Sequence, residues 1–203
     1  MEFILPCSLM KYDLPSSEDE VLPNLLGLTT MQQIAEAEFE GFTEAEIILT
    51  EELDERTRFT SAYIQRIHTL ALGHLYAFAG KWRDVNLSKG GFSFAAARFL
   101  PETMRTFDQE VVSGLKGTND SDALIGEIAT VHAELLFIHP FREGNGRTAR
   151  ILANLMSRKA GYGPLRFERI GDREFDEYVL AVQRAALKDY APMERVIRAV
   201  FPT

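Results

Sequence analysis

Residues 139–150 read His-Pro-Phe-Arg-Glu-Gly-Asn-Gly-Arg-Thr-Ala-Arg and bring a base, a carboxylate and two arginines close together in the chain. His139 supplies an imidazole that titrates near neutral pH and can take a proton from a hydroxyl group. Glu143 supplies a carboxylate that can hold Mg²⁺, since this ion in nucleotide sites uses one or two carboxylates plus phosphate oxygens. The combination predicts a site for polyphosphate chemistry.

The glycines of the segment predict an anion-binding turn. Gly144 and Gly146 can both take positive φ, and Asn145 between them tolerates it better than most residues. Such a turn directs successive backbone N–H groups into one concavity, which binds anions. Arg147 and Arg150 lie three residues apart, and we expect them to reach the same side of the following helix. Cations there oppose the helix dipole by roughly 0.3–1 kcal/mol each, so we expect an anion between them.

Two buried helices are expected to hold this turn. Residues 147–159 contain no Gly or Pro and carry apolar residues at helical spacing, namely Ile151, Leu152, Leu155 and Met156. An apolar stretch over 125–138 precedes His139, and Phe141 is expected to point back into the core. The turn then leads into a helix N-terminus, where unpaired N–H groups favour phosphate.

Each of these features also has a purely structural interpretation. His139 after a buried helix is by itself more typical of a structural histidine, and a lone Gly-x-Gly is usually a turn. Glu143 alone would be a solvated carboxylate, and the two arginines alone would be a surface pair. Their occurrence together at compact spacing favours one shared site.

The segment matches the motif of the Fic (filamentation-induced-by-cAMP) family, His-x-Phe-x-Asp/Glu-Gly-Asn-Gly-Arg-x-x-Arg, at every specified position. The resemblance extends over about residues 22–184. Residues 76–94 resemble the helix end and the β-hairpin "flap" that precede the motif in this family. The resemblance implies an all-α helical bundle with a small β-hairpin flap.

The same resemblance implies an activity, the transfer of AMP from ATP to a Tyr, Ser or Thr hydroxyl of a target protein with release of pyrophosphate. It makes His139 the base and Glu143 the ligand of Mg²⁺ at the α- and β-phosphates. The backbone of the glycine turn forms the anion hole, and the Asn145 side chain also reaches the α-phosphate. Nucleotide and phosphate binding is thereby assigned to Gly144, Asn145, Gly146, Arg147 and Arg150.

Docking and regulation are implied in the same way. The flap pairs with an extended segment of the target by β-augmentation, through Lys89, Gly90, Gly91 and Phe92. Many family members are silenced by a helix reading Ser/Thr-x-x-x-Glu-Gly/Asn, and this sequence has no match. In the nearest candidates, Glu36 replaces the Ser/Thr before Glu40-Gly41, and Ser16-x-x-x-Glu20 is followed by Val21. A separate small antitoxin could supply the glutamate, with this chain as the toxin of a toxin–antitoxin pair.

Composition sets the broad class. Apolar content of 46% and charged content of 26% are ordinary for a globular chain, and the net charge of −8 argues against a nucleic-acid-binding surface. Cys7 is the single cysteine, which allows no internal disulfide and fits a reducing cytosol. No apolar run approaches the length of a membrane span. We therefore expect a cytoplasmic protein without nucleic-acid or membrane partners.

The organisation of the chain is simple. Residues 1–29 are expected to form an irregular N-terminal arm, and residues 30–203 a single domain with flanking helices. Thr30-Met-Gln-Gln33 and Thr43-Glu-Ala-Glu46 are capping boxes that predict two short helices, with Gly41 as a stop between them. Further helices are expected over about 61–78, 101–112, 172–187 and 191–200.

Some roles stay open at this point. His132 could stack beneath the site or belong to the core, and Tyr178 could line an adenine pocket or pack in the core. Trp82 and Arg83 are assigned to hairpin packing, and His68 and His74 to structural roles. Two other functions compete with adenylylation, namely transfer of phosphate or another nucleotide and a catalytically quiet binding module. Relatives that transfer phosphate carry a lysine where Gly146 stands, and no motif residue is missing here.

Overall fold

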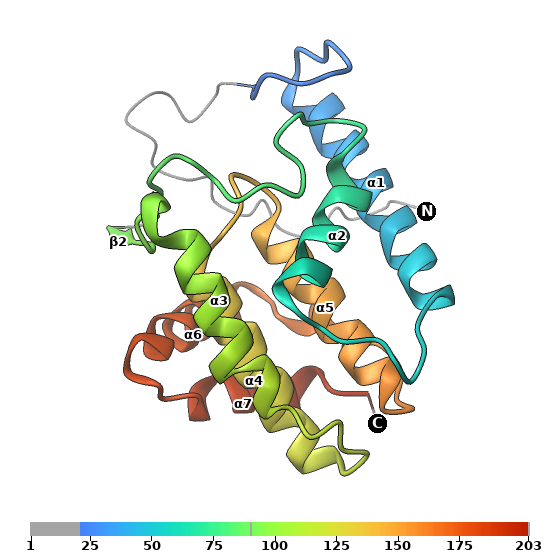
Figure 1. The fold of residues 1–203 in the computed structure, drawn as a ribbon, viewed down its shortest axis with the longest axis vertical. Helices are drawn as coiled ribbons and strands as arrows, with labels where there is room; N and C mark the ends of the chain where they lie inside the picture. Colours follow the sequence, from blue (N-terminus) through green and yellow to red (C-terminus); the bar gives the residue numbers. More distant parts are fainter. Residues whose placement is uncertain (1–20, 90, 203) are drawn as a thin grey trace.

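The computed structural model describes residues 21–89 and 91–202, and the regular secondary structure of these ranges is helical apart from one two-stranded hairpin (Figure 1). The expected all-α class with a small hairpin is thus confirmed. The α-helices are α1 (Met31–Glu51), α2 (Ser61–Leu72), α3 (Leu100–Glu110), α4 (Ser121–Ile138), α5 (Asn145–Lys159), α6 (Asp172–Arg184) and α7 (Ala191–Val200). Most of the expected arm, residues 1–20, lies outside the described ranges.

Helix α5 occupies the middle of the bundle. It contacts α1 and α2 on one side and α4 on another, while α6 and α7 pack against α4 (Figure 1). The predicted apolar face of α5 is buried, as is most of the stretch before His139. Phe141, which follows that stretch, has no exposed surface, so it points into the core as expected. Each helix of the described ranges is too short or too polar to traverse a bilayer.

The prediction of two short helices around Gly41 is wrong, because α1 continues through this residue. The Thr30 capping box is present, with Thr30 Oγ1 accepting from the Gln33 N–H at 3.3 Å. Thr43 caps nothing and instead donates its hydroxyl to the Phe39 carbonyl at 2.8 Å. A Cβ at Gly41 would lie 2.0 Å from the Ala71 carbonyl oxygen on α2. Glycine therefore serves the close packing of two helices here, not a helix end.

Helix α2 is shorter than predicted, since it ends at Leu72 and not near Phe78. The chain folds back onto α2, where the Gly80 N–H donates to His68 Nδ1 at 2.8 Å and the Gly80 carbonyl accepts from Gln65 Nε2 at 2.8 Å. Leu75 is still fully buried in the turn that follows the helix. The prediction placed the helix end too late because it took the apolar Leu75 as part of the buried helix face.

The hairpin consists of β1 (Ser88–Lys89) and β2 (Phe92–Ser93), paired antiparallel with Lys89 opposite Phe92. Its turn was predicted at Lys89-Gly90-Gly91, and of these residues Gly90 lies outside the described ranges. The backbone of Gly91 has φ +77°, a conformation that glycine adopts without strain. The two C-terminal helices lie where they were predicted, with a short 3₁₀ turn at Ala185–Leu187 between them.

Candidate functional site

His139 follows the last residue of α4 and has a left-handed backbone, with φ 54° and ψ 59°. Its N–H donates to the Leu135 carbonyl at 3.0 Å, which closes the helix. The ring stacks on Phe94 of the hairpin with centroids 4.0 Å apart, and the residue is only 8% exposed. Burial, together with the nearby charges of Arg83 and Lys89, lowers the pKa of His139 to about 3. The imidazole is therefore neutral at physiological pH.

The hydrogen bonds of His139 fix which ring nitrogen is basic. Nδ1 lies 3.1 Å from the Leu136 carbonyl oxygen. Because a carbonyl only accepts, Nδ1 carries the proton of the neutral ring, and Nε2 keeps the lone pair. A neutral imidazole with a defined basic nitrogen is the form in which a histidine takes up a proton.

Arg83 was assigned only to hairpin packing, yet it connects the hairpin to His139. It is 3% exposed, and its Nε donates to the His139 carbonyl at 2.8 Å. Its Nη1 donates to the Val85 carbonyl at 2.7 Å, and its Nη2 to the Ala95 carbonyl at 2.5 Å. One guanidinium thus ties the left-handed residue to both sides of the hairpin base. Sequence spacing did not reveal this role, because Arg83 lies among other charged residues, Lys81 and Asp84.

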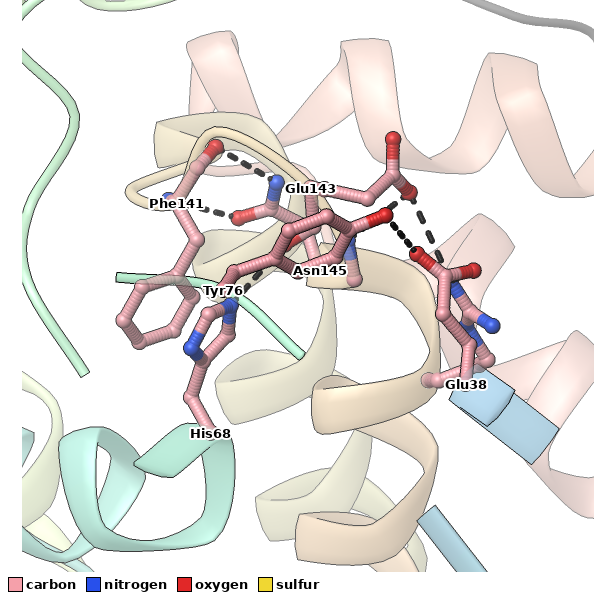
Figure 2. A network of polar contacts seen from close by, with 8 residues as sticks. Glu38, His68, Tyr76, Phe141, Glu143 and Asn145 are labelled. Carbon is pink, nitrogen blue, oxygen red and sulfur yellow. Dashed lines mark hydrogen bonds and ion pairs between the residues drawn. The ribbon is translucent and has the colours of Figure 1, made fainter. Parts of the chain in front are cut away.

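The loop between His139 and α5 is closed by Asn145 (Figure 2). Asn145 Oδ1 accepts from the Phe141 N–H at 2.8 Å, and Nδ2 donates to the Phe141 carbonyl at 2.8 Å. The residue is 1% exposed. Both polar atoms of the amide make hydrogen bonds inside the loop, and the second N–H of Nδ2 is the donor with which this side chain would reach a phosphate. Asn145 contributes to the turn by shaping it.

His68 supports the same loop from α2. Since the Gly80 N–H donates to its Nδ1, the proton of the neutral ring is on Nε2, which donates to the Glu143 carbonyl at 3.0 Å. The ring stacks on Phe141 at 3.9 Å between centroids (Figure 2). Burial lowers the pKa of His68 to about 4. His68 therefore has the structural role that the sequence predicted.

The two glycines of the turn differ. Gly144 has φ +74°, and a Cβ there would lie 2.9 Å from Phe42 Cζ and 3.0 Å from Leu72 Cδ1. Gly146 is part of α5 and does not have the positive φ that the sequence suggested as possible, since helix α5 already begins at Asn145. A Cβ at Gly146 would meet no described atom within 4 Å. Gly144 thus shapes the turn, and Gly146 leaves open space beside the first N–H groups of α5, which lack intrahelical acceptors.

Glu143 lies beside this helix end. Its Oε1 accepts from the Gly144 N–H at 2.9 Å and lies 3.5 Å from Arg147 Nη2. Burial raises its pKa, and the negative charge of Glu38 raises it further, against the opposing effects of Gly144, Arg147 and Lys89. The side chain remains 28% exposed, so it is accessible to a cation.

The two motif arginines do not reach the same side, contrary to the sequence prediction. Arg147 lies over the Phe42 ring of α1 at 4.6 Å and contacts Glu38. Arg150 lies over the Phe167 ring at 5.5 Å, in the segment before α6. The two guanidinium groups of α5 therefore pack against different neighbours, Arg147 against α1 and Arg150 against the segment before α6.

Glu38 is a site residue that the sequence analysis missed. It is 6% exposed, and its Oε2 accepts from Arg147 Nη2 at 2.7 Å while its Oε1 accepts from the Tyr76 hydroxyl at 2.8 Å (Figure 2). The available signal was a single glutamate on the buried face of α1, in line with Ile34, Phe42 and Ala45. Glu40, the glutamate of the near-match to the inhibitory motif, is exposed.

The hairpin lies against this site. Besides the stacking of Phe94 on His139, Phe92 packs on Phe137 of α4 with centroids 5.9 Å apart. Lys89 lies near both His139 and Glu143, and burial lowers its pKa. A segment docked along the hairpin would therefore pass close to the imidazole.

Comparison with known proteins agrees with this geometry. The model of the Fic/DOC family matches residues 58–157. Among curated proteins, the chain is 32% identical over 137 residues to "Protein adenylyltransferase Fic" of Nematostella vectensis. The match covers 66% of this chain and 30% of the relative, so the chain spans under a third of that protein's length.

Solved structures share the fold. The N-terminal Fic domain of a cell filamentation protein from Bartonella quintana has a TM-score of 0.72 at 20% identity, covering 93% of this chain and 91% of that one. The BepC protein of Bartonella tribocorum with bound AMPPNP has a TM-score of 0.69 at 18% identity, covering 93% and 96% of the two chains.

Proposed function

The chain belongs to the Fic/DOC family, and we propose from this membership that it transfers AMP from ATP to a hydroxyl group of a target protein, releasing pyrophosphate. The observation that carries the proposal is the placement of a neutral, buried His139 next to the open N-terminus of α5. Relatives named protein adenylyltransferases, and a related fold holding AMPPNP, support a nucleotide as the donor.

In the proposed reaction His139 Nε2 takes the proton of the target hydroxyl as its oxygen attacks the α-phosphorus. The new O–P bond forms, the bond to the β-phosphate bridging oxygen breaks, and pyrophosphate leaves. The Leu136 carbonyl fixes the tautomer of the imidazole, and Arg83 holds the backbone of His139 through its carbonyl. A positioned base of this kind accelerates proton transfer by about 10²–10⁴.

The helix end stabilises the charge that develops on phosphate. The N–H groups of Asn145, Gly146 and Arg147 are at the first positions of α5, where the dipole favours anions. Arg147 and Arg150 add positive charge from two directions. The open space at Gly146 admits a phosphate close to the backbone, and the lysine that phosphate-transferring relatives carry there would occupy it.

Mg²⁺ fits the donor set that this site offers. The described residues contain no group of three or more His, Cys, Asp or Glu side chains that could hold a metal without help. One accessible carboxylate, Glu143, suits an ion whose remaining ligands are phosphate oxygens and water. Bound there, Mg²⁺ would neutralise phosphate charge.

We assign the target to the hairpin. Its two strands are short, and an extended segment pairing with the hairpin beside Lys89 and Phe92 would present a hydroxyl toward His139. The predicted docking residues are Lys89, Gly90, Gly91 and Phe92, of which Gly90 lies outside the described residues. The stacking of Phe94 on the imidazole fixes the position of the hairpin relative to His139.

Regulation by a separate antitoxin is also part of the proposal, with this chain as a toxin. Two observations support it. The sequence lacks the inhibitory motif, and the near-match Glu40 is exposed and points away from the core. The other near-match, Ser16 to Glu20, lies outside the described residues. Co-expression with a small protein that carries the motif should relieve growth inhibition by the wild-type chain.

The decisive experiment uses ATP labelled at either phosphate. With Mg²⁺ and lysate or the enzyme itself as acceptor, label from the α-position should enter protein and label from the γ-position should not. Incorporation of γ-label alone would contradict adenylylation and establish phosphate transfer. Absence of both labels, with targets from several sources, would favour a binding module.

A further inference from the structure

A chain of buried polar groups links three helices behind the site. His132 of α4 is 1% exposed and Tyr178 of α6 is 6% exposed. His132 Nδ1 lies 3.2 Å from the Ala149 carbonyl oxygen of α5, and its Nε2 lies 2.6 Å from the Tyr178 hydroxyl. Neither residue belongs to the motif. Because polar groups are costly to bury in an apolar core, this row of hydrogen-bonded side chains suggests a role beyond packing.

The positions of the protons in these hydrogen bonds follow from the Ala149 carbonyl, which can only accept. His132 Nδ1 therefore carries a proton. Burial, and next the charge of Arg150, lower the pKa of His132 to about 3, so the ring is neutral and Nε2 is an acceptor. The Tyr178 hydroxyl must then donate to Nε2. Its oxygen lone pairs are left to accept from another donor.

Arg150 is the cation next to this oxygen. Burial raises the pKa of Tyr178 to about 12, and the nearby Arg150 guanidinium acts against that rise. The same guanidinium packs over Phe167, whose ring also stacks on His132 at 5.4 Å. Arg150 Nε is buried and has no hydrogen-bond partner among the described residues. The guanidinium is thus held from one side and keeps donor capacity for a ligand.

Arg147 and Arg150 differ in whether their neighbours carry a charge, and this difference affects how well each can bind an anion. Arg147 is paired with the carboxylate of Glu38, which offsets its charge. Arg150 lies over the Phe167 ring and close to the neutral Tyr178 hydroxyl, and neither group neutralises the guanidinium. A fixed and fully charged arginine is suited to a phosphate group, since no ion pair has to be broken first.

We propose that Tyr178, oriented by His132, is a positioning residue that holds the Arg150 guanidinium ready for the outer phosphates of a nucleoside triphosphate. The inference rests on the proposed function in that the ligand is ATP. Tyr178 is part of the buried core, as one of its two sequence interpretations expected, and the proposal adds a role for its hydroxyl.

The test compares nucleotide binding by Tyr178→Phe and wild type, with Mg-ATP and with AMP, by calorimetry. The variant should bind ATP about tenfold more weakly, because the Arg150 guanidinium loses the hydroxyl that orients it. AMP, which lacks the outer phosphates, should bind equally well to both. Tyr190→Phe is the matched control, because it removes another tyrosine hydroxyl that donates to a buried acceptor, Glu134, and it should leave both affinities unchanged.

A purely structural role for Tyr178 is separated by a double-mutant cycle. If Tyr178 acts through Arg150, Tyr178→Phe should have no further effect on ATP affinity in an Arg150→Ala background. His132→Leu removes the acceptor of the Tyr178 proton and should give the same selective loss of ATP binding, which provides a second variant if Tyr178→Phe folds poorly. Equal losses for ATP and AMP, or additive effects in the cycle, would overturn the inference.

These outcomes are distinct from failure of the proposed function. A wild-type protein that binds Mg-ATP but transfers no label contradicts adenylylation, while the comparison of ATP and AMP binding still decides the role of Tyr178. A wild-type protein with no affinity for Mg-ATP overturns both.

Discussion

Glu38 Oε2 and Arg147 Nη2 are 2.7 Å apart, in an ion pair that joins the first helix to the Fic motif across more than a hundred residues of sequence. The glutamate side chain is 9% exposed and the arginine side chain 29%. The Tyr76 hydroxyl also donates to Glu38, and Phe42 lies under the guanidinium. The pair therefore fixes α1 to the N-terminal turn of α5, and it makes the stability of the fold depend on a motif arginine.

We expect Arg147→Ala to lower the free energy of unfolding by about 2 kcal/mol, because it leaves the Glu38 carboxylate buried with Tyr76 as its remaining partner. Breaking a fully buried pair costs about 3–5 kcal/mol, and the partial exposure of Arg147 reduces that value. Chemical denaturation of the variant and wild type would measure the difference.

The matched control is the double variant Glu38→Gln with Arg147→Ala, which removes the unpaired charge and should recover at least half of the lost stability. If Arg147→Ala and the double variant have equal free energies of unfolding, the unpaired charge of Glu38 is not the cause of the lost stability.

The two turn glycines give a second prediction, since alanine should affect them in opposite ways. Gly144→Ala places a Cβ 2.9 Å from Phe42 at a φ of +74°, and we expect a loss of about 2–4 kcal/mol from overpacking and backbone strain. Gly146→Ala adds a methyl group to a helical residue with open space around it, so the fold should be as stable as wild type or slightly more stable.

Nucleotide binding distinguishes them further. The Gly146→Ala methyl group would lie where the proposed phosphate approaches the backbone, and ATP affinity should fall at least fivefold in a well-folded protein. Thermal unfolding with and without Mg-ATP measures both properties. Undiminished stabilisation by ATP would place the nucleotide away from the N-terminus of α5.

The sequence predicted the motif-bearing elements well because their signals are local. The spacing of apolar residues identified α5, and the motif identified the turn with its base and carboxylate. It failed where long-range packing decides the outcome. Gly41 has the chemistry of a helix stop, and only the proximity of the Ala71 carbonyl explains its place inside a helix. Arg147 and Arg150 diverge because Glu38 and Phe167 come from distant segments.

Charged residues outside the motif were the other class that sequence reasoning missed. Glu38 and Arg83 are separated from His139 by 101 and 56 positions respectively, a distance at which spacing carries no information about contact. Both have charged neighbours in sequence, Glu36 and Glu40 for the first and Lys81 and Asp84 for the second. For Glu38 the signal is its place at helical spacing with Ile34 and Phe42, since a buried charge requires a partner.

Arg83 yields a third prediction. Its planar guanidinium donates to the His139, Val85 and Ala95 carbonyls at once, which a lysine ammonium cannot reproduce in the same geometry. Arg83→Lys should lower the rate of AMP transfer about 10–100-fold while the affinity for Mg-ATP stays within twofold, because a small misplacement of a base is costly and phosphate binding uses other groups. The control is Arg66→Lys, which alters an exposed ion pair with Glu52. A parallel loss of ATP affinity would argue that Arg83 supports the whole site and not the base.

His139→Asn separates catalysis from folding at the most strained residue of the site. Asparagine tolerates the left-handed conformation better than alanine does and carries no base, so AMP transfer should fall about 10²–10⁴-fold with ATP binding retained.

The His139→Asn variant should also be less destabilised by acid than wild type. With a folded pKa of about 3 against about 6.5 in the unfolded chain, wild-type His139 takes up a proton on unfolding between these values. Its contribution to stability is therefore complete above about pH 6.5 and is lost as the pH falls, by about 1.4 kcal/mol per pH unit. Urea unfolding at pH 7 and pH 4.5 should show that the variant loses about 2–3 kcal/mol less than wild type on acidification. An equal loss in both proteins would mean that the imidazole is protonated in the folded state at mild acidity, which is incompatible with a buried neutral base.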